Sequence, residues 1–193
     1  MQVAVIVVFT AFISDFRKKG GMVPLMKKEL ILLLKLLYLA PLIAYGYVLH
    51  TMRSVFVSDF VALALTLLGT ILVAKARVDL GTHHVWTGYF LETKTLVTTG
   101  VYAFLRHPLY TGICLFIWGG LITVVSRAPW LLNVIVLASV SYIQAFLCVA
   151  AAKETRILEQ EHGHQFITYR SEVHAFLPRR LFKVVRRVRN KRT

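Results

Sequence analysis

Cysteine and acidic residues are both scarce in this chain of 193 residues. Its two cysteines, Cys114 and Cys148, both lie inside apolar runs. This excludes a disulfide framework and a zinc site built on cysteine. Only nine residues are acidic, against 23 lysines and arginines. The apolar runs carry few ionisable residues, which argues against an ion pathway through a membrane-spanning bundle.

The sequence also lacks the marks of a cleaved signal peptide and of a metal site. No cationic residue precedes the first apolar stretch, residues 3–13, and the basic triplet at 17–19 follows it without a small-residue cleavage site. We therefore expect a retained span. No H-E-x-x-H pattern is present, so we predict no metal and interpret five histidines as surface residues: His83, His84, His162, His164 and His174.

Apolar residues are abundant instead. They make up 57% of the chain, whose mean hydropathy is +0.65, against about 45–50% in soluble domains. A helix needs about 20 residues to cross a bilayer. Five segments meet or approach that length: 1–16, which is short, then 29–49, 57–74, 109–126 and 130–152. We predict an all-α integral membrane protein of about five transmembrane helices. Pro41 should kink the second helix.

The basic residues indicate the orientation of the bundle. Of the 23 lysines and arginines, 20 lie in the segments 17–28 and 75–108 and from residue 153 onward, while the alternate loops hold only Arg53 and Arg127. By the positive-inside rule, the N-terminus is outside and the C-terminal tail is cytoplasmic. Function is then expected on the cytoplasmic face, where the loop 75–108 and the tail lie.

An Arg106-His107-Pro108 triplet opens the fourth apolar segment. Proline suits a first helical turn, and the exposed helix N-terminus, with an arginine and a histidine beside it, suits an anionic group such as a carboxylate. A simpler interpretation is that Arg106 extends to lipid phosphates and Pro108 merely starts a helix.

Glu154 lies where the fifth apolar segment leaves the membrane. We predict that this helix continues until Gly163 caps it, with Glu154, Leu158 and Glu161 near one face. Glu154 is either paired with a neighbour such as Lys153, or solvated, or functional; Glu159 and Glu161 are expected to be solvated. Because only residues 126–129 separate the last two segments, they should form a hairpin that brings Glu154 close to the triplet. A small zwitterion with hydroxyl groups would fit between them.

Two stretches resemble a known family. They are KTLVTTGVYAFLRHPLYTG and, about forty residues later, KETRILEQEHGHQFITYRSEVHAFLP. Together they resemble the isoprenylcysteine carboxyl methyltransferase and phospholipid methyltransferase superfamily of membrane enzymes, over roughly residues 75–178. The resemblance divides the chain into N-terminal transmembrane helices (1–74), a methyltransferase core (75–178) and a basic tail (179–193).

This resemblance implies S-adenosylmethionine as cofactor. It implies a cytoplasmic pocket formed by the long loop, the last hairpin and the start of the tail. Arg106 and Glu154 are the candidate catalytic residues, and Arg106 serves either cofactor or substrate. His107 suits the cofactor carboxylate, Glu154 its amino or ribose groups, and the tyrosines its adenine or sulfonium. The implied cofactor-binding residues are Lys94, Thr95, Leu96, Val97, Tyr102, His107, Pro108, Leu109, Tyr110 and Glu154.

Two departures from the family pattern weaken a prenylcysteine substrate specifically. Ala150 stands where such enzymes often carry arginine, and Lys153 where they often carry an acidic residue. We see no clear general base, and a carboxylate acceptor needs none. We therefore predict O-methylation of a lipophilic carboxylate of the isoprenylcysteine type, reaching the site sideways from the bilayer. The alternatives are N-methylation of a phospholipid or small amine, and a non-catalytic lipid-binding module.

The basic tail predicts a membrane partner. Placed after a membrane bundle, it is expected to lie on anionic lipid, and we expect no nucleic acid to bind it. The membrane would be the plasma membrane in a bacterium and the endoplasmic reticulum in a eukaryote.

Overall fold

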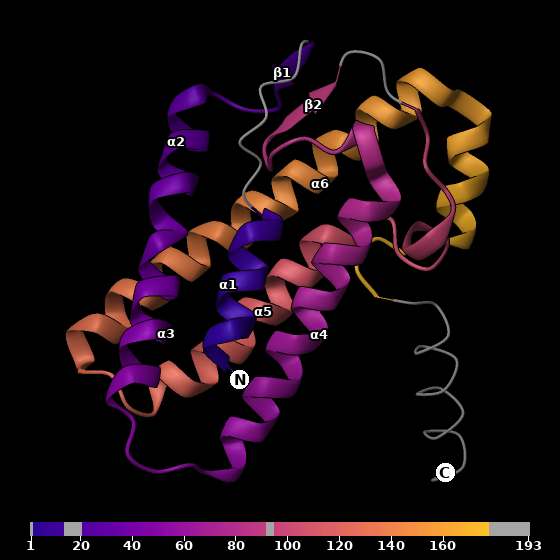
Figure 1. Cartoon of the computed structure of the whole chain (residues 1–193). Coiled ribbons are helices and arrows are strands. Elements are labelled where there is room, and N and C mark those ends of the chain that lie inside the picture. Colours follow the sequence, from indigo (N-terminus) through magenta and orange to yellow (C-terminus); the bar gives the residue numbers. More distant parts are fainter. Residues whose placement is uncertain (1, 14–20, 92–94, 178–193) are drawn as a thin grey trace, which may run out of the picture.

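Most of the chain forms helices that run between the two ends of the molecule (Figure 1). This computed structural model describes residues 2–13, 21–91 and 95–177, so Lys94 and the basic tail lie outside the described residues. Within them, the helices are α1 (Gln2–Ile13), α2 (Lys28–Leu37), α3 (Leu39–Thr51), α4 (Val57–Leu80), α5 (Pro108–Val125) and α6 (Trp130–Glu172). Two 3-10 helices, η1 (Gly81–His83) and η2 (Gly100–Ala103), and two strands, β1 (Met22–Pro24) and β2 (Tyr89–Leu91), lie between them.

Four helical units of the described chain are long and apolar enough to cross a membrane. They are Lys28–Thr51, which joins α2 and α3, then Val57–His83, Pro108–Val125 and Trp130–Glu172. The prediction of an all-α membrane protein is therefore confirmed. Of the first predicted span, 1–16, the structure describes residues 2–13, which form α1 with 12 residues. At about 1.5 Å per residue, α1 reaches roughly 18 Å of the about 30 Å of a hydrocarbon core.

The second span is interrupted close to Pro41, where the sequence predicts a kink. The interruption is at Tyr38, between α2 and α3, where the backbone keeps helical torsions (φ −62°, ψ −27°). Proline has no N–H to donate to the carbonyl four residues earlier, which here belongs to Leu37. The interruption therefore falls one turn before the proline itself.

Helices α4 and α5 pack closely along a row of small residues. A Cβ atom on Gly112 would lie 2.7 Å from the carbonyl oxygen of Gly69, and one on Gly119 would lie 2.7 Å from that of Ala62. Such contacts let two backbones approach directly, which is how helices commonly associate in membranes. Helix α1 rests on this pair, where Phe9 stacks on Phe116 with ring centroids 3.6 Å apart.

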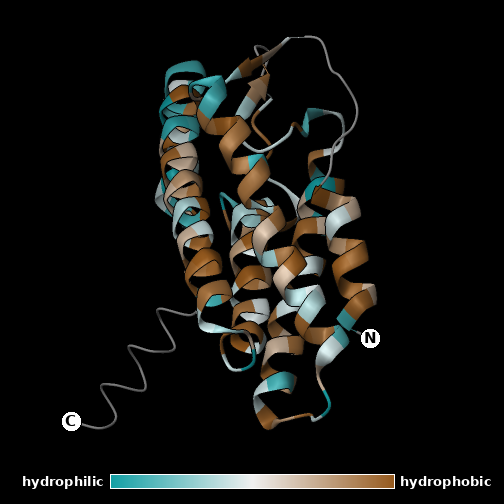
Figure 2. Cartoon of the chain, turned by 90° about the vertical axis from the view of Figure 1, so that its left-hand side faces the viewer, coloured by the Kyte–Doolittle hydropathy of each residue, from teal (hydrophilic) through white to brown (hydrophobic). Residues whose placement is uncertain are grey.

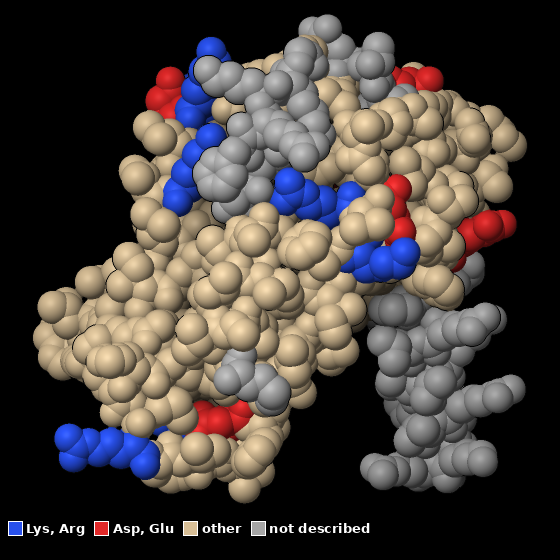
Figure 3. Space-filling model, in the orientation of Figure 1, with Lys and Arg blue, Asp and Glu red and all other residues tan. Residues whose placement is uncertain are grey.

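Polar residues gather at the two ends of the bundle. Hydrophobic residues dominate the middle of the helices, and hydrophilic ones the ends (Figure 2). On the face drawn in Figure 3, lysines and arginines concentrate at the end that carries β1, β2 and the last turns of α6. That end holds the loop between α4 and α5, in keeping with the distribution of charge in the sequence.

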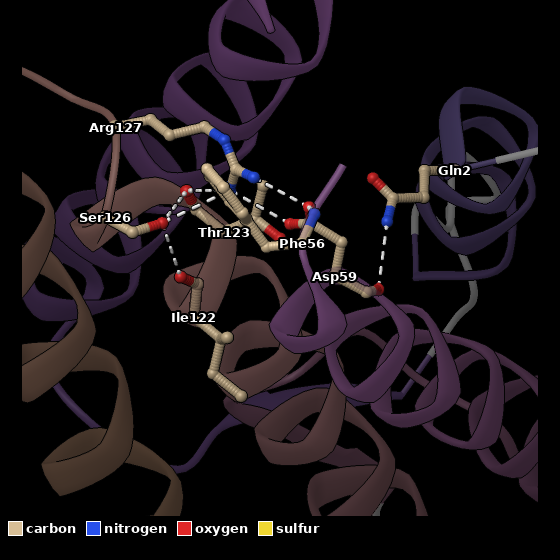
Figure 4. A network of polar contacts seen from close by, with 7 residues as sticks. All are labelled: Gln2, Phe56, Asp59, Ile122, Thr123, Ser126 and Arg127. Atoms are coloured by element: carbon tan, nitrogen blue, oxygen red, sulfur yellow. Dashed lines mark hydrogen bonds and ion pairs between the residues drawn. The ribbon is translucent and has the colours of Figure 1, made fainter. Parts of the chain in front are cut away.

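The opposite end is closed by an ion pair that the sequence did not predict (Figure 4). The predicted apolar span 57–74 contains one acidic residue, Asp59, which is only 3% exposed. Asp59 accepts hydrogen bonds from Arg127 at 2.6 and 2.9 Å and from the Phe56 backbone N–H at 2.8 Å. The carboxylate thus caps the first turn of α4 and joins α4 to the connection between α5 and α6.

A small antiparallel strand pair is the one departure from an all-helical fold within the described residues. Val23 of β1 pairs with Phe90 of β2, and the Leu25 N–H donates to the Gly88 carbonyl at 2.8 Å. Lys153 of α6 donates to the Leu25 carbonyl at 2.9 Å. These bonds join the segment before α2, the loop after α4 and the upper part of α6.

Candidate active site

A cleft opens at the end of the bundle that carries the strand pair. Its volume is about 950 Å³, with the solvent at its mouth included. The last turn of α4, the loop 83–91, the segment 95–97, η2, the first turn of α5 and the upper part of α6 line it. These segments are spread over residues 80–169, and the bundle brings them together.

The start of α5 forms one wall of the cleft, as the sequence predicts. Pro108 occupies the first turn of α5, after His107 with its non-helical backbone (φ −124°, ψ 59°). The His107 ring is buried and stacks on that of Tyr110, with centroids 5.6 Å apart. Its two nitrogens face α6: Nδ1 lies 3.4 Å from Glu154 Oε2, and Nε2 lies 3.4 Å from Thr155 Oγ1.

Glu154 lies across the cleft from this helix start. The Tyr110 hydroxyl donates to Glu154 Oε1 at 2.6 Å. Lys153, considered as a partner for Glu154, instead donates to the Leu25 carbonyl. The expected meeting of the triplet with Glu154 is therefore confirmed, and the carboxylate is held by a tyrosine and a histidine of α5 and its N-cap.

Arg106 is anchored on one side only. Its Nε donates to the Val173 carbonyl at 3.0 Å. Its Nη1 is buried and has no hydrogen-bond partner within the described part of the chain. Burial lowers the pKa of the Arg106 guanidinium, and the nearby charge of Arg170 lowers it further. A buried cationic donor without a partner is a ready binding point for an anion.

The residues after α6 hold the triplet in place through backbone hydrogen bonds. The Arg106 N–H donates to the His174 carbonyl and the His107 N–H to the Ala175 carbonyl, both at 2.9 Å. Thr111 Oγ1 donates to the Phe176 carbonyl at 3.2 Å. We call residues 173–176 the closing segment, because they fix the backbone that carries Arg106 and His107.

A tight turn brings Tyr102 into the cleft. Gly100 has φ +62°, and the Val101 N–H that follows donates to Asp79 Oδ2 of α4 at 2.8 Å. A Cβ on Gly100 would lie 2.1 Å from that carboxylate oxygen, so only glycine fits the turn. Tyr102 is buried, and burial raises the pKa of its hydroxyl, as does the negative charge of Glu154.

Most predicted cofactor-binding residues line the cleft. Besides Tyr102, His107, Tyr110 and Glu154, these are Thr95, Leu96, Val97 and Leu109, and Arg106 lines it as well. Pro108 is buried but does not line the cleft, because it begins the helix behind His107. Lys94 lies outside the described residues.

Gly163 redirects α6 instead of ending it. It has non-helical torsions (φ 48°, ψ −123°), and the helix resumes beyond it to Glu172. The resumed part turns back (Figure 1), and two of its residues line the cleft. Arg170 consequently reaches Glu159 at 2.9 Å, so Glu159 is paired and not merely solvated. The prediction of a cap at Gly163 was right that the helix is interrupted there and wrong that it ends there.

This return places two aromatic residues that we had not assigned to the site. Phe166 and Tyr169 line the cleft, and the Tyr169 hydroxyl donates to the Tyr102 carbonyl at 2.6 Å. The signal was available in the sequence, since both belong to the G-x-x-F-x-x-Y pattern that begins at Gly163.

The loop 83–91 is the larger part that sequence reasoning missed. His83, His84, Trp86 and Tyr89 all line the cleft. His84 is only 4% exposed, so its interpretation as a surface residue was wrong. Lys35 extends from α2 to the face of the Trp86 ring, 4.6 Å from its centroid. No group of three possible metal ligands occurs among the described residues.

Comparison with known families identifies the family of the chain. The family model of phospholipid methyltransferases matches residues 57–161, which is more than half of the chain. The chain belongs to that family. No curated protein matches the chain significantly. The matched region contains the RHP triplet, Tyr110 and Glu154, and it stops before Phe166 and Tyr169. The protein is therefore a membrane protein of a methyltransferase family, which agrees with the resemblance seen in the sequence.

Proposed function

We propose that the protein transfers a methyl group from S-adenosylmethionine to a lipophilic acceptor, most simply by O-methylation of a carboxylate. The observation that carries this proposal is the arrangement around Glu154, whose carboxylate is held between Tyr110 and His107, together with Arg106 Nη1 beside the same cleft, which has no hydrogen-bond partner among the described residues. The Glu154 carboxylate suits the amino or ribose groups of the methyl donor, and the Arg106 cation suits the carboxylate of the acceptor.

The chemistry of the cleft suits S-adenosylmethionine. Glu154 offers a carboxylate to the amino or ribose groups of the donor, and Tyr102 and Tyr110 offer aromatic faces to its adenine or sulfonium. The other predicted cofactor-binding residues that line the cleft are those of segment 95–97 and Leu109. The donor supplies a methyl group already activated on a positive sulfur.

The protein then has to orient the acceptor and keep water away. A carboxylate is ionised at neutral pH, and Arg106 can hold it by a charge-assisted hydrogen bond. The acceptor oxygen forms a bond to the methyl carbon while the carbon–sulfur bond breaks and its electron pair stays on sulfur. No proton moves, so no general base is required. The apolar side chains of Leu96, Val97 and Phe166 limit the access of water.

N-methylation of an amine-bearing lipid is the second candidate. An ammonium group must lose a proton before it can attack. The pair of His107 and Glu154, 3.4 Å apart, is the group in the cleft best suited to receive that proton. The name of the matching family also favours a phospholipid. The two candidates differ in the bond that is made, which is an ester in one case and a methylamine in the other.

Binding of S-adenosylhomocysteine to the purified full-length protein tests the proposal first. We expect binding by the wild type, loss of binding in Glu154→Gln, and retention in Glu161→Gln, which changes an exposed carboxylate of the same helix. No binding by the wild type would overturn the proposal and favour a non-catalytic lipid-binding module. Membranes incubated with methyl-labelled donor then separate the candidates, because ester label is released by mild base and methylamine label is not.

A further inference from the structure

A second cavity lies on the other side of the Arg106–His107 backbone. It has a volume of about 780 Å³, with open solvent included, and it runs between α6 and the closing segment. Arg106 and His107 line both this cavity and the first cleft. We call it the side groove.

The upper end of the side groove is strongly cationic. Arg106, Arg156 and Arg170 line it, and Glu159 is the one acidic residue among its lining residues. Glu159 pairs with Arg170 at 2.9 Å. Three guanidinium groups therefore face a single carboxylate, and Arg106 Nη1 is left without a partner within the described residues. An anion in the groove would relieve this imbalance.

The other end of the side groove is apolar and lies deeper along α6. Cys148, Ala152 and Phe176 line it, and the small side chains of α6 leave room beside the helix. Cys148 and Arg156 are eight residues apart, which is about 12 Å along a helix.

The exposed side chains of α6 mark where this groove meets the membrane. The large apolar residues exposed on α6 run from Trp130 to Val149 and do not recur until Ile167. Lys153 follows Val149 by four residues. Cys148 therefore lies at the level of the apolar belt, and Arg156 lies beyond it. The groove therefore extends from the level of the apolar belt of the protein to its polar surface.

We propose that the side groove binds the methyl acceptor, and that the acceptor is an amphiphile with an anionic head group. Its carboxylate or phosphate contacts Arg106, Arg156 and Arg170, and its hydrocarbon chain follows Cys148 and Ala152 toward the bilayer. Arg106, shared with the first cleft, is where the acceptor meets the methyl donor. This inference rests on the proposed function and adds the chemical class and the route of the acceptor.

Cys148 provides a direct readout of occupancy. In a Cys114→Ser variant it is the single remaining thiol of the chain, and it is exposed. With the protein in lipid nanodiscs, the rate of maleimide labelling is measured against three amphiphiles of equal chain length: an alkyl carboxylate, an alkyl phosphate and an alkyl trimethylammonium. We expect the two anions to protect Cys148 and the cation not to protect it. Equal protection by all three, or by the cation best, overturns the inference.

A matched pair of variants tests whether the positive charge of the side groove binds the anionic head group. Arg170→Gln and Glu159→Gln break the same ion pair, but only the first removes a cation from the groove. We expect Arg170→Gln to weaken protection by the carboxylate about fivefold, which is typical of one exposed charged contact. Glu159→Gln should leave protection unchanged or strengthen it. Equal weakening by both variants would mean that the ion pair acts only structurally, and it would overturn the charge assignment.

Comparison of the two acidic head groups indicates the source of the acceptor. Better protection by the carboxylate favours a fatty or prenylated acid, and better protection by the phosphate favours a phospholipid. Both support the anionic class. S-adenosylhomocysteine binding, measured on the same proteins, is expected to be unchanged in Arg170→Gln. Failure of protection with intact cofactor binding overturns this inference alone, whereas absence of cofactor binding overturns the proposed function.

Discussion

At the scale of single residues, the site depends on how one carboxylate is held. Glu154 receives a hydrogen bond from Tyr110 and lies next to the His107 ring, so its two oxygens have different partners. Because His107 and Tyr110 stack on each other, the three side chains form one unit. A charge fixed in this way needs little reorganisation when a ligand binds.

Tyr110→Phe removes one of these partners and keeps the ring. Hydrogen bonds to charged groups contribute about 1.5–3 kcal/mol, so we expect the affinity for S-adenosylhomocysteine to fall roughly tenfold with little change in thermal stability. Isothermal titration and thermal unfolding in the same detergent measure the two effects. Tyr142→Phe is the control, because that hydroxyl donates to the Leu30 carbonyl outside the cleft. Similar affinity losses in both variants would contradict the prediction.

Gly100 offers a second test at a single position. Gly100→Ala and Gly81→Ala both place a side chain at positive φ, which costs about 1–2 kcal/mol. Only the Gly100 side chain would collide with Asp79, since nothing lies within 4 Å of a Cβ on Gly81. We expect Gly100→Ala to lose about 2 kcal/mol more in unfolding free energy, together with cofactor affinity. Equal destabilisation would show that Asp79 moves aside without cost.

At the scale of helices, the close packing of α4 and α5 brings two parts of the cleft together. The end of α4 and the start of α5 both line it. Gly112→Ala inserts a methyl group 2.7 Å from the Gly69 carbonyl, which should cost about 1–3 kcal/mol. Gly46→Ala in α3 meets open space, so it should be neutral or stabilising. Thermal unfolding of both variants measures this, and a neutral Gly112→Ala would contradict the packing argument.

The helices were also the level at which the sequence was most informative. The helix start at Pro108, the short connection between α5 and α6 and the position of Glu154 together predicted the two walls of the cleft. The loop 83–91 could not be predicted, because Trp86 and Tyr89 are placed by pairing with β1 and by Lys35, which are distant in sequence. Phe166 was missed because Gly163 turns the helix and does not stop it.

At the scale of the whole molecule, the two ends of the bundle have different roles. The cleft occupies one end, and the pair of Asp59 and Arg127 closes the other. Removing one partner of a buried pair leaves an uncompensated charge. We expect Arg127→Ala to lower the unfolding free energy by about 3 kcal/mol while cofactor affinity is retained in the folded fraction. The neighbouring Ser126→Ala serves as the control, and loss of affinity without loss of stability would contradict this separation.

The orientation in the membrane is a further prediction at this scale. Positive charge on the cleft side predicts that this end faces the cytoplasm. In a variant with both native cysteines replaced, a cysteine introduced as Arg53→Cys should react with an impermeant thiol reagent added to intact cells. A cysteine introduced as Thr82→Cys should react only after the cells are opened. The reverse result would invert the proposed topology.

The closing segment has a consequence for how the protein is made. The backbone of Arg106 and His107 is fixed by the carbonyl groups of His174 and Ala175, which the ribosome adds about seventy residues after it adds the triplet. All the helices must therefore be synthesised before the wall between the two cavities is fixed. A product cut short before residue 173 would insert its helices yet lack a formed site. Such a fragment would reach the membrane without methylating anything there.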